Sequence, residues 1–169
     1  FALAANACFD EPKQKLMEYC IENLNDLVKV AEEENVILLL GTVMGMDSPC
    51  NASTPIVLTV DEVAEIIEQI GSSYLAAYAD TQVLSIRGES LTDWFDRLGE
   101  KVRLVRFTDG NYNGYRIWGK GVLPAEKLAE EIYRTGFNGL ISFQIPGERY
   151  CENPKDAQKQ NHFRALSAW

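Results

Sequence analysis

The sequence is short of the features that mark several classes of protein. Its 169 residues include one histidine and four cysteines, and 25 acidic residues against 16 basic ones give a formal net charge of -9. Such an acidic chain lacks the positive face that binds phosphates, which argues against a nucleic-acid partner. Cys8, Cys20, Cys50 and Cys151 have no spacing typical of a metal site or a disulfide framework, which favours a reducing, cytoplasmic location.

Long apolar runs are missing as well. The runs that are present, such as Val36–Leu40, are far below the roughly 20 residues that cross a bilayer, so no membrane partner is expected. Residues 1–8 are apolar but lack the basic start of a signal peptide. Because the chain opens on Phe1 within an apolar stretch, we expect a fragment or a processed chain.

The pattern that is present alternates strands with helices. Apolar residues at helical spacing, with start and stop signals, predict helices over 12–35, 59–70, 90–98, 124–134 and 156–169. Apolar runs predict strands over 36–40, 74–79, 102–108 and 140–145, after a short apolar stretch at 1–6. Thr59 and Glu62 have the spacing of a capping box, and Gly71 marks the end of the same helix.

About five strands alternating with helices predict a single α/β domain over 1–169 with a parallel sheet. Two architectures remain open on pattern alone. A five-stranded, flavodoxin-like sheet fits the length, whereas a complete (β/α)8 barrel takes about 250 residues. No glycine-rich phosphate loop follows the first strand, and polar residues end several strands, as they do in barrels.

Three segments favour the barrel over the flavodoxin-like sheet. Residues 98–109 end a strand at Asp109, residues 116–121 hold a Gly-x-Gly turn, and residues 135–143 run from Gly136-Phe137-Asn138-Gly139 into a strand. In this order and spacing they resemble the last two units of the xylose-isomerase-like barrel family, which includes tagatose and fructoselysine epimerases, hydroxypyruvate isomerase and endonuclease IV. Residues 22–24 and 31–32 resemble the helix before that family's fifth strand. The resemblance implies a partial (β/α)8 TIM barrel of about five units, strands 4–8, with strands 1–3 absent.

The resemblance also implies a metal site. Members of the family hold Mn²⁺, Mg²⁺ or Co²⁺ with a glutamate, an aspartate, a histidine and a second glutamate, at the ends of strands five to eight. The matching positions here are Gly41, Asp80, Arg106 and Gln144, so one ligand of the set survives. An arginine in that place would repel a divalent cation, so we expect no metal cofactor and an ion pair between Asp80 and Arg106.

The remaining candidates are weaker. Arg116 lies where related epimerases place a substrate-binding arginine, and a surface role is an equal alternative. A loop rich in glycine and aromatic residues is expected over 110–121. Trp118 and Tyr115 are candidates for stacking on a sugar or for packing within this loop, and Asp109 with Gly119–Gly121 is expected to shape it. Two further candidates are Glu148, which could supply the carboxylate that Gln144 lacks, and His162, which we interpret as structural. Cys50 has no neighbouring base and is interpreted as a bystander.

Three functions follow as hypotheses. The first is a non-catalytic sugar isomerase or epimerase homologue, a pseudoenzyme that associates with itself or with another barrel-forming chain. The second is an active sugar isomerase or epimerase with a different ligand set, such as Asp80, Asp109 and Glu148. The third is a metal-free protein that binds a small sugar or sugar acid through Arg106 and Arg116.

Overall fold

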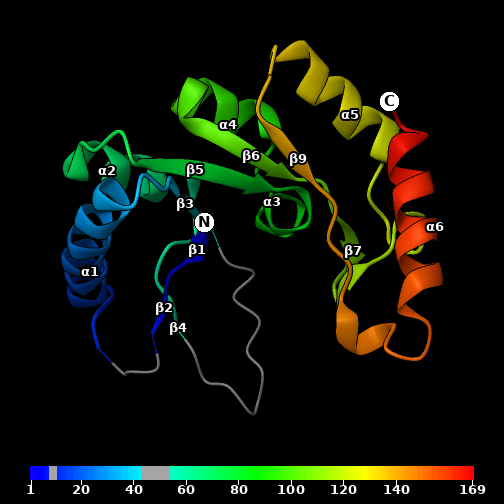
Figure 1. Cartoon of the computed structure of the whole chain (residues 1–169), viewed down its shortest axis with the longest axis horizontal. Coiled ribbons are helices and arrows are strands. Elements are labelled where there is room, and N and C mark those ends of the chain that lie inside the picture. The colour runs from blue at the N-terminus through cyan, green and yellow to red at the C-terminus, as the bar shows by residue number, and fades with distance from the viewer. Residues whose placement is uncertain (8–10, 43–53) are drawn as a thin grey trace. The chain divides into compact units, whose positions relative to one another are not determined.

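The computed structural model describes residues 1–7, 11–42 and 54–169. Helices and strands alternate along the chain, as predicted (Figure 1). The helices are α1 (Lys13–Glu33), α2 (Val60–Ile70), α3 (Thr81–Arg87), α4 (Leu91–Leu98), α5 (Ala125–Arg134) and α6 (Pro154–Leu166). The strands are β1 (Ala2–Ala4), β2 (Asn6–Ala7), β3 (Leu38–Gly41), β4 (Thr54–Pro55), β5 (Leu75–Asp80), β6 (Val102–Arg106), β7 (Asp109–Asn111), β8 (Gly114–Arg116) and β9 (Leu140–Ser142).

The main sheet has five strands in the order β1-β3-β5-β6-β9. The pairs β1–β3, β3–β5 and β6–β9 are all parallel. Strands that follow one another in the sequence are therefore neighbours in the sheet, without the reversal of strand order that a flavodoxin-like sheet has. This order confirms the α/β fold with about five parallel strand–helix units and decides for the partial barrel.

The chain forms two compact units. The first contains residues 1–78 and 96–103, and the second contains residues 79–95 and 104–169. Strands β5 and β6 and helix α4 each pass from one unit into the other. None of the helices in the described part of the chain is both long enough and apolar enough to cross a membrane.

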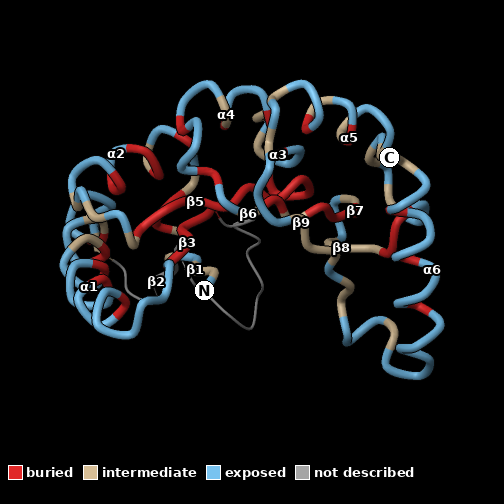
Figure 2. The backbone as a smooth tube through the Cα atoms, turned by 45° about the horizontal axis from the view of Figure 1, so that its top comes forward, coloured by how far each residue is buried: buried red, intermediate tan, exposed pale blue. Residues whose placement is uncertain are grey.

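The first unit packs α1 and α2 on β1, β3 and β5. One stripe of α1 is buried, and it consists of Leu16, Cys20, Leu24, Val28 and Ala31. Strand β3 and the residues of β5 are buried at every position, as expected for parallel strands covered on both faces (Figure 2). The predicted helix over 12–35 and the strand over 36–40 are thus found within a few residues of their expected bounds.

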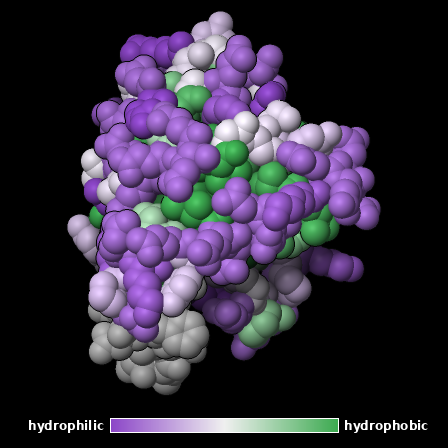
Figure 3. Space-filling model, turned by 90° about the vertical axis from the view of Figure 1, so that its left-hand side faces the viewer, coloured by the Kyte–Doolittle hydropathy of each residue, from purple (hydrophilic) through white to green (hydrophobic). Residues whose placement is uncertain are grey.

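A second apolar stripe of α1 stays partly exposed beside the edge strand β1. Tyr19 and Leu27 are 43% and 46% exposed, and with Leu3, Ala4 and Leu40 they line a groove of about 270 Å³. Figure 3 faces the α1 and α2 side of this unit and shows apolar side chains gathered among polar ones. This unit therefore has an apolar groove along the outer edge of its sheet.

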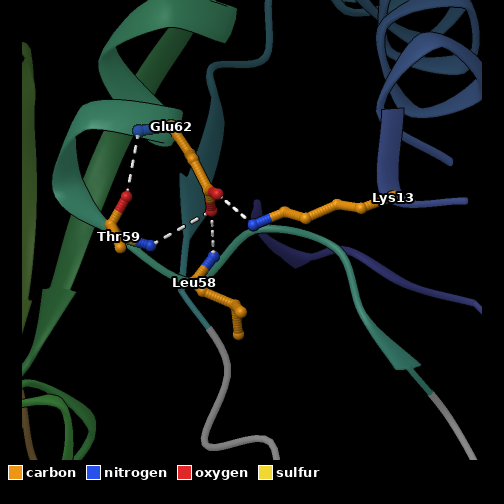
Figure 4. Close-up of polar contacts among 4 residues, drawn as sticks. All are labelled: Lys13, Leu58, Thr59 and Glu62. Carbon is orange, nitrogen blue, oxygen red and sulfur yellow. Dashed lines mark hydrogen bonds and ion pairs between the residues drawn. The ribbon is translucent and has the colours of Figure 1, made fainter. Parts of the chain in front are cut away.

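Helix α2 begins at the predicted capping box (Figure 4). The Thr59 hydroxyl accepts a hydrogen bond from the Glu62 amide at 3.3 Å. The Glu62 carboxylate accepts from the Leu58 amide at 2.7 Å and the Thr59 amide at 3.3 Å, and it forms an ion pair with Lys13 at the start of α1. The helix ends at Gly71, whose φ of 68° is a left-handed conformation that glycine adopts without strain.

The second unit contains α3, α5, α6, β9 and the β7–β8 hairpin. Its core includes Phe107, whose ring stacks on Trp118 at 4.4 Å between centroids and contacts Phe143 and Trp169 at 6.1 and 5.7 Å. Two elements here differ from the prediction. The β7–β8 hairpin lies within residues 109–116, most of which belong to the loop expected over 110–121, and α3 follows β5 directly where no helix was predicted. The other helices begin and end within three residues of their expected bounds.

Candidate functional site

Asp80 joins the end of β5 to the start of α3. Its backbone is extended, and its Oδ1 accepts hydrogen bonds from the amides of Gln82 at 3.0 Å and Val83 at 3.3 Å. These are two of the amides that the first turn of a helix leaves without an intrahelical acceptor. Asp80 is therefore the N-cap residue of α3, a position that favours aspartate for this reason.

Two hydroxyl groups also donate hydrogen bonds to the Asp80 carboxylate. Thr108 donates to Oδ1 at 2.7 Å, and Tyr115, from β8, donates to Oδ2 at 2.9 Å. Thr108 is itself held by Thr81, whose hydroxyl accepts from the Thr108 amide at 2.8 Å and donates to the Thr108 carbonyl at 2.6 Å. Asp80, Thr81 and Thr108 are all at most 3% exposed, so this is a buried polar network.

Opposing effects act on the pKa of Asp80. Burial raises the pKa of Asp80 above its usual value, because desolvation disfavours the charged form. Hydrogen bonds from Thr108, Tyr115 and the Val83 amide act in the opposite direction, as does the positive charge of Arg106. Arg106 thus influences Asp80 through its charge, while the hydrogen-bond donors to the carboxylate are Thr108, Tyr115 and two backbone amides.

The carboxylate of Asp109 also accepts hydrogen bonds from backbone amides, here those of the loop that follows it. Asp109 is 1% exposed. Its Oδ1 accepts from the amides of Gly110 at 2.7 Å and Leu123 at 3.1 Å, and its Oδ2 accepts from those of Gly119 at 3.0 Å and Gly121 at 2.9 Å. A β-carbon at Gly121 would lie 2.1 Å from Oδ1, which explains the glycine. Asp109 shapes the loop, as expected, and has no free lone pair directed at a ligand.

Trp118 does not offer its ring to a ligand. Only 3% of it is exposed. Its indole nitrogen donates to the Phe107 carbonyl at 3.1 Å, and its ring stacks on Phe107. Of the two alternatives for Trp118, these contacts match packing within the loop, where the indole lies against Phe107 in the core of this unit.

Arg116 lines a polar pocket instead. The pocket measures about 500 Å³ and lies between the loop after β8 and the start of α6, with Lys120, Tyr150, Asn153 and Gln160 among its lining residues. Arg116 is partly buried, and its guanidinium donates to the Tyr115 carbonyl at 3.0 Å. The pocket also contains one carboxylate, that of Asp156, which accepts from the Asn153 amide group at 2.7 Å. Hydrogen-bond donors therefore dominate this pocket.

Gly41 lies at the end of β3 in the first unit. A β-carbon there would lie 2.5 Å from Cε1 and Cζ of Tyr78 and 2.8 Å from Cε2. Tyr78 is 4% exposed, so its ring is held inside this unit. The position expected for the first glutamate ligand has no side chain, and an aromatic ring takes up the adjacent space.

The remaining expected positions lie in the second unit and offer no carboxylate cluster. Gln144 follows β9 and is exposed, as is Glu148. His162 is exposed on α6, where its ring contacts Phe143 edge-on at 5.7 Å, which fits the structural role expected for it. In the part of the chain that the structure describes, no group of three or more His, Cys, Asp or Glu side chains is arranged to hold a metal ion. Cys50 lies outside the described residues.

These donors do not fit a divalent metal of the expected kind. Such a metal needs several oxygen or imidazole ligands with free lone pairs. Glycine has no donor at all, arginine is a permanent cation, and Asp80 already accepts four hydrogen bonds. Of the four expected positions, only Asp80 carries a metal-ligand side chain, and its carboxylate is held in the buried network with Thr108 and Tyr115.

The order of the strands and the position of Asp80 point to one family. A model of the xylose isomerase-like TIM barrel matches residues 3–166. The chain belongs to this family. It is similar to fructoselysine 3-epimerase of Escherichia coli O157:H7, with 26% identity over 96% of this chain and 58% of that protein. It is also similar to D-psicose 3-epimerase of Enterocloster bolteae, with 25% identity over 70% of this chain and 36% of that protein.

Several solved structures share the fold. The IOLI protein with a bound zinc atom superposes with a TM-score of 0.76 at 15% identity, over 98% of this chain and 60% of that one. D-psicose 3-epimerase of Clostridium cellulolyticum H10, in complex with D-tagatose, gives a TM-score of 0.66 at 18% identity, over 95% and 56%. The chain thus spans less than two thirds of the length of these relatives.

Proposed function

We propose that this chain is a non-catalytic member of the sugar epimerase family whose metal site has become part of the structural core. The observation that carries this proposal is the state of Asp80, the one expected ligand that remains. Both of its carboxylate oxygens are occupied, by two amides of α3, the Thr108 hydroxyl and the Tyr115 hydroxyl. Coordination of a metal through Oδ1 would uncap α3, and coordination through Oδ2 would displace the Tyr115 hydroxyl.

The chemistry of the other expected positions supports the same proposal. Moving a proton on carbon needs a base, and in this family a metal that polarises the neighbouring carbonyl. The amide of Gln144 has no useful basicity, and Gly41 contributes neither a base nor a ligand. Among the four expected positions, all of which lie in the described part of the chain, Gly41, Arg106 and Gln144 therefore offer no base to remove a proton.

A solvent-exchange assay tests this part of the proposal. The purified chain is incubated with D-psicose and with fructoselysine in D₂O containing Mn²⁺, and deuterium at the carbon next to the carbonyl is followed by NMR. We expect no exchange above the rate without protein, while fructoselysine 3-epimerase of Escherichia coli serves as the active control. Exchange that is lost in Asp80→Ala but kept in a surface variant such as Val122→Lys would overturn the proposal.

We also propose that the chain associates with itself or with another barrel-forming chain. The support is the apolar groove of the first unit, formed by Leu3, Ala4 and Ala5 of the edge-strand segment and by Tyr19 and Leu27 of α1. An edge strand beside an apolar helix face is suited to receive a further strand–helix unit. Sedimentation velocity of the purified chain tests this. We expect association that Leu27→Lys weakens and Val122→Lys does not, and a monomer at all concentrations would contradict self-association.

A metal-free sugar-acid binder is the second candidate, and the pocket beside Arg116 favours it. Arg116, Lys120, Asn153 and Gln160 provide donors within a volume of about 500 Å³, which suits a small anionic polyol. Calorimetric titration with D-gluconate and with D-glucitol as the uncharged control tests it. Binding of gluconate that Arg116→Ala abolishes would favour this candidate, and equal heats for the two compounds would exclude it.

A further inference from the structure

Gly41 and Tyr78 meet on one face of the sheet in the first unit. The register of β3 and β5 pairs Leu39 with Ala76 and Leu40 with Ala77, so Gly41 and Tyr78 are next in line. Because side chains alternate between faces along a strand, Tyr78 shares its face with Leu39, Gly41 and Ala76. Two of these neighbours are the smallest residues available, and the large ring of Tyr78 lies among them.

The contact at Gly41 is closer than any side chain would permit. A β-carbon at position 41 would lie 2.5 Å from two ring carbons of Tyr78 and 2.8 Å from a third, well inside the usual 3.5–4.0 Å separation of carbon atoms. The φ of Gly41 is not in the left-handed region, so the backbone does not require glycine here. The ring of Tyr78 is what excludes a side chain.

The ring has little freedom to give way. Tyr78 is 4% exposed and stands in β5, where every residue is buried. A protein interior is packed as densely as an organic crystal, so displacing a buried ring shifts its neighbours as well. A side chain added at position 41 therefore has to compete with Tyr78 for the same space.

We infer that the Tyr78 ring packs directly against the backbone of Gly41, and that the ring fills the space into which a ligating side chain at position 41 would extend. This inference rests on the proposed function, because it explains how the lost ligand position became part of the core. It adds that positions 41 and 78 are coupled. Restoring glutamate at position 41 alone would not rebuild a ligand, since Tyr78 would first have to become smaller.

A double-mutant cycle tests the coupling. Gly41→Ala is made in the natural chain and in a Tyr78→Leu background, and urea unfolding is followed by circular dichroism. Overpacking by one methyl group should raise the unfolding equilibrium constant about tenfold in the natural background. In the Tyr78→Leu background, the same substitution should change it less than about twofold, because the ring is gone. Gly147→Ala, where an added β-carbon would meet nothing within 4 Å, is the matched control and should have little effect in either background.

The outcomes separate this inference from the proposed function. Equal destabilisation by Gly41→Ala in both backgrounds would refute the coupling between Gly41 and Tyr78, whatever the metal assays give. If Gly41→Ala does not fold in the natural background but folds with Tyr78→Leu, the coupling is supported as well. Stoichiometric Mn²⁺ binding by the natural chain would contradict the metal-free function and leave the result of the cycle unaffected.

Discussion

Replacing Asp80 tests whether this carboxylate is structural. In Asp80→Ala, the Gln82 and Val83 amides lose their N-cap acceptor, and the Thr108 and Tyr115 hydroxyls lose theirs. In Asp80→Asn, the remaining side-chain oxygen still accepts from the amides and from Thr108. The new amide group faces the Tyr115 hydroxyl, which can turn to accept a hydrogen bond.

The two variants should therefore differ in stability. Loss of an N-cap costs about 0.5–2 kcal/mol, and each buried polar group left without a partner costs about 1–3 kcal/mol. For Asp80→Ala we expect a loss of about 3–5 kcal/mol in the free energy of unfolding. Asparagine caps helices about as well as aspartate, so Asp80→Asn should lose only about 1 kcal/mol.

Urea titration near neutral pH, followed by circular dichroism and tryptophan fluorescence, measures both values. The difference between the alanine and asparagine variants is the quantity of interest, because it removes effects that are common to any change at this position. If both variants were as stable as the natural chain, the network would not depend on Asp80, and the structural role would be refuted.

Three further predictions concern other contacts. Asp109→Asn should destabilise the chain by more than Asp80→Asn in the same urea assay. Each oxygen of Asp109 accepts from two backbone amides, and the new amide group would face two of these donors with a donor of its own. Equal losses in the free energy of unfolding for the two variants would contradict this. Glu62→Ala removes a capping box and should lower the free energy of unfolding by about 1 kcal/mol, whereas Lys13→Ala removes only an exposed ion pair and should lower it by less; the reverse order would refute the assignment. Cys20 is buried and its pKa is raised by desolvation, so iodoacetamide should label it more slowly than the exposed Cys151, as peptide mass spectrometry can show; equal rates would place Cys20 at the surface.

Much of the fold could be predicted because local signals and tertiary packing agree. The apolar stripe of α1, the capping box at Thr59 and Glu62, and the glycine after Ile70 each indicate the element that the structure contains. The continuous apolar run before Gly41 indicated a strand covered on both faces. Strand order could not be obtained from such signals, since it depends on contacts between distant residues, and the family resemblance supplied it.

Helix α3 was missed because its N-cap was interpreted as a strand end with a metal-ligand role. Asp80 followed by Thr81 and Gln82 is also a helix start signal, and the seven residues of α3 end at Gly88 in a left-handed conformation. A short helix carries too few residues for a clear apolar period. The aspartate therefore matched two patterns at once.

The contacts of Tyr78, Tyr115 and Trp118 could not be predicted from sequence. Tyr78 contacts Gly41, 37 positions earlier in the sequence, only because β3 and β5 pair in one register. Tyr115 reaches Asp80 only because residues 109–116 form a hairpin where a loop was expected. An aromatic residue in a loop has the same sequence signal whether it packs inward, as Trp118 does, or stacks on a ligand.

Metal content is the most direct test of the central claim that the family's metal site has become structural. The chain is purified without chelator, analysed for bound metals by mass spectrometry, and then titrated with Mn²⁺ in a calorimeter. The account predicts no stoichiometric metal in the purified chain and no saturable heat of binding. One tightly bound Mn²⁺ per chain that disappears in Asp80→Asn would contradict it and make sugar epimerisation the activity to assay.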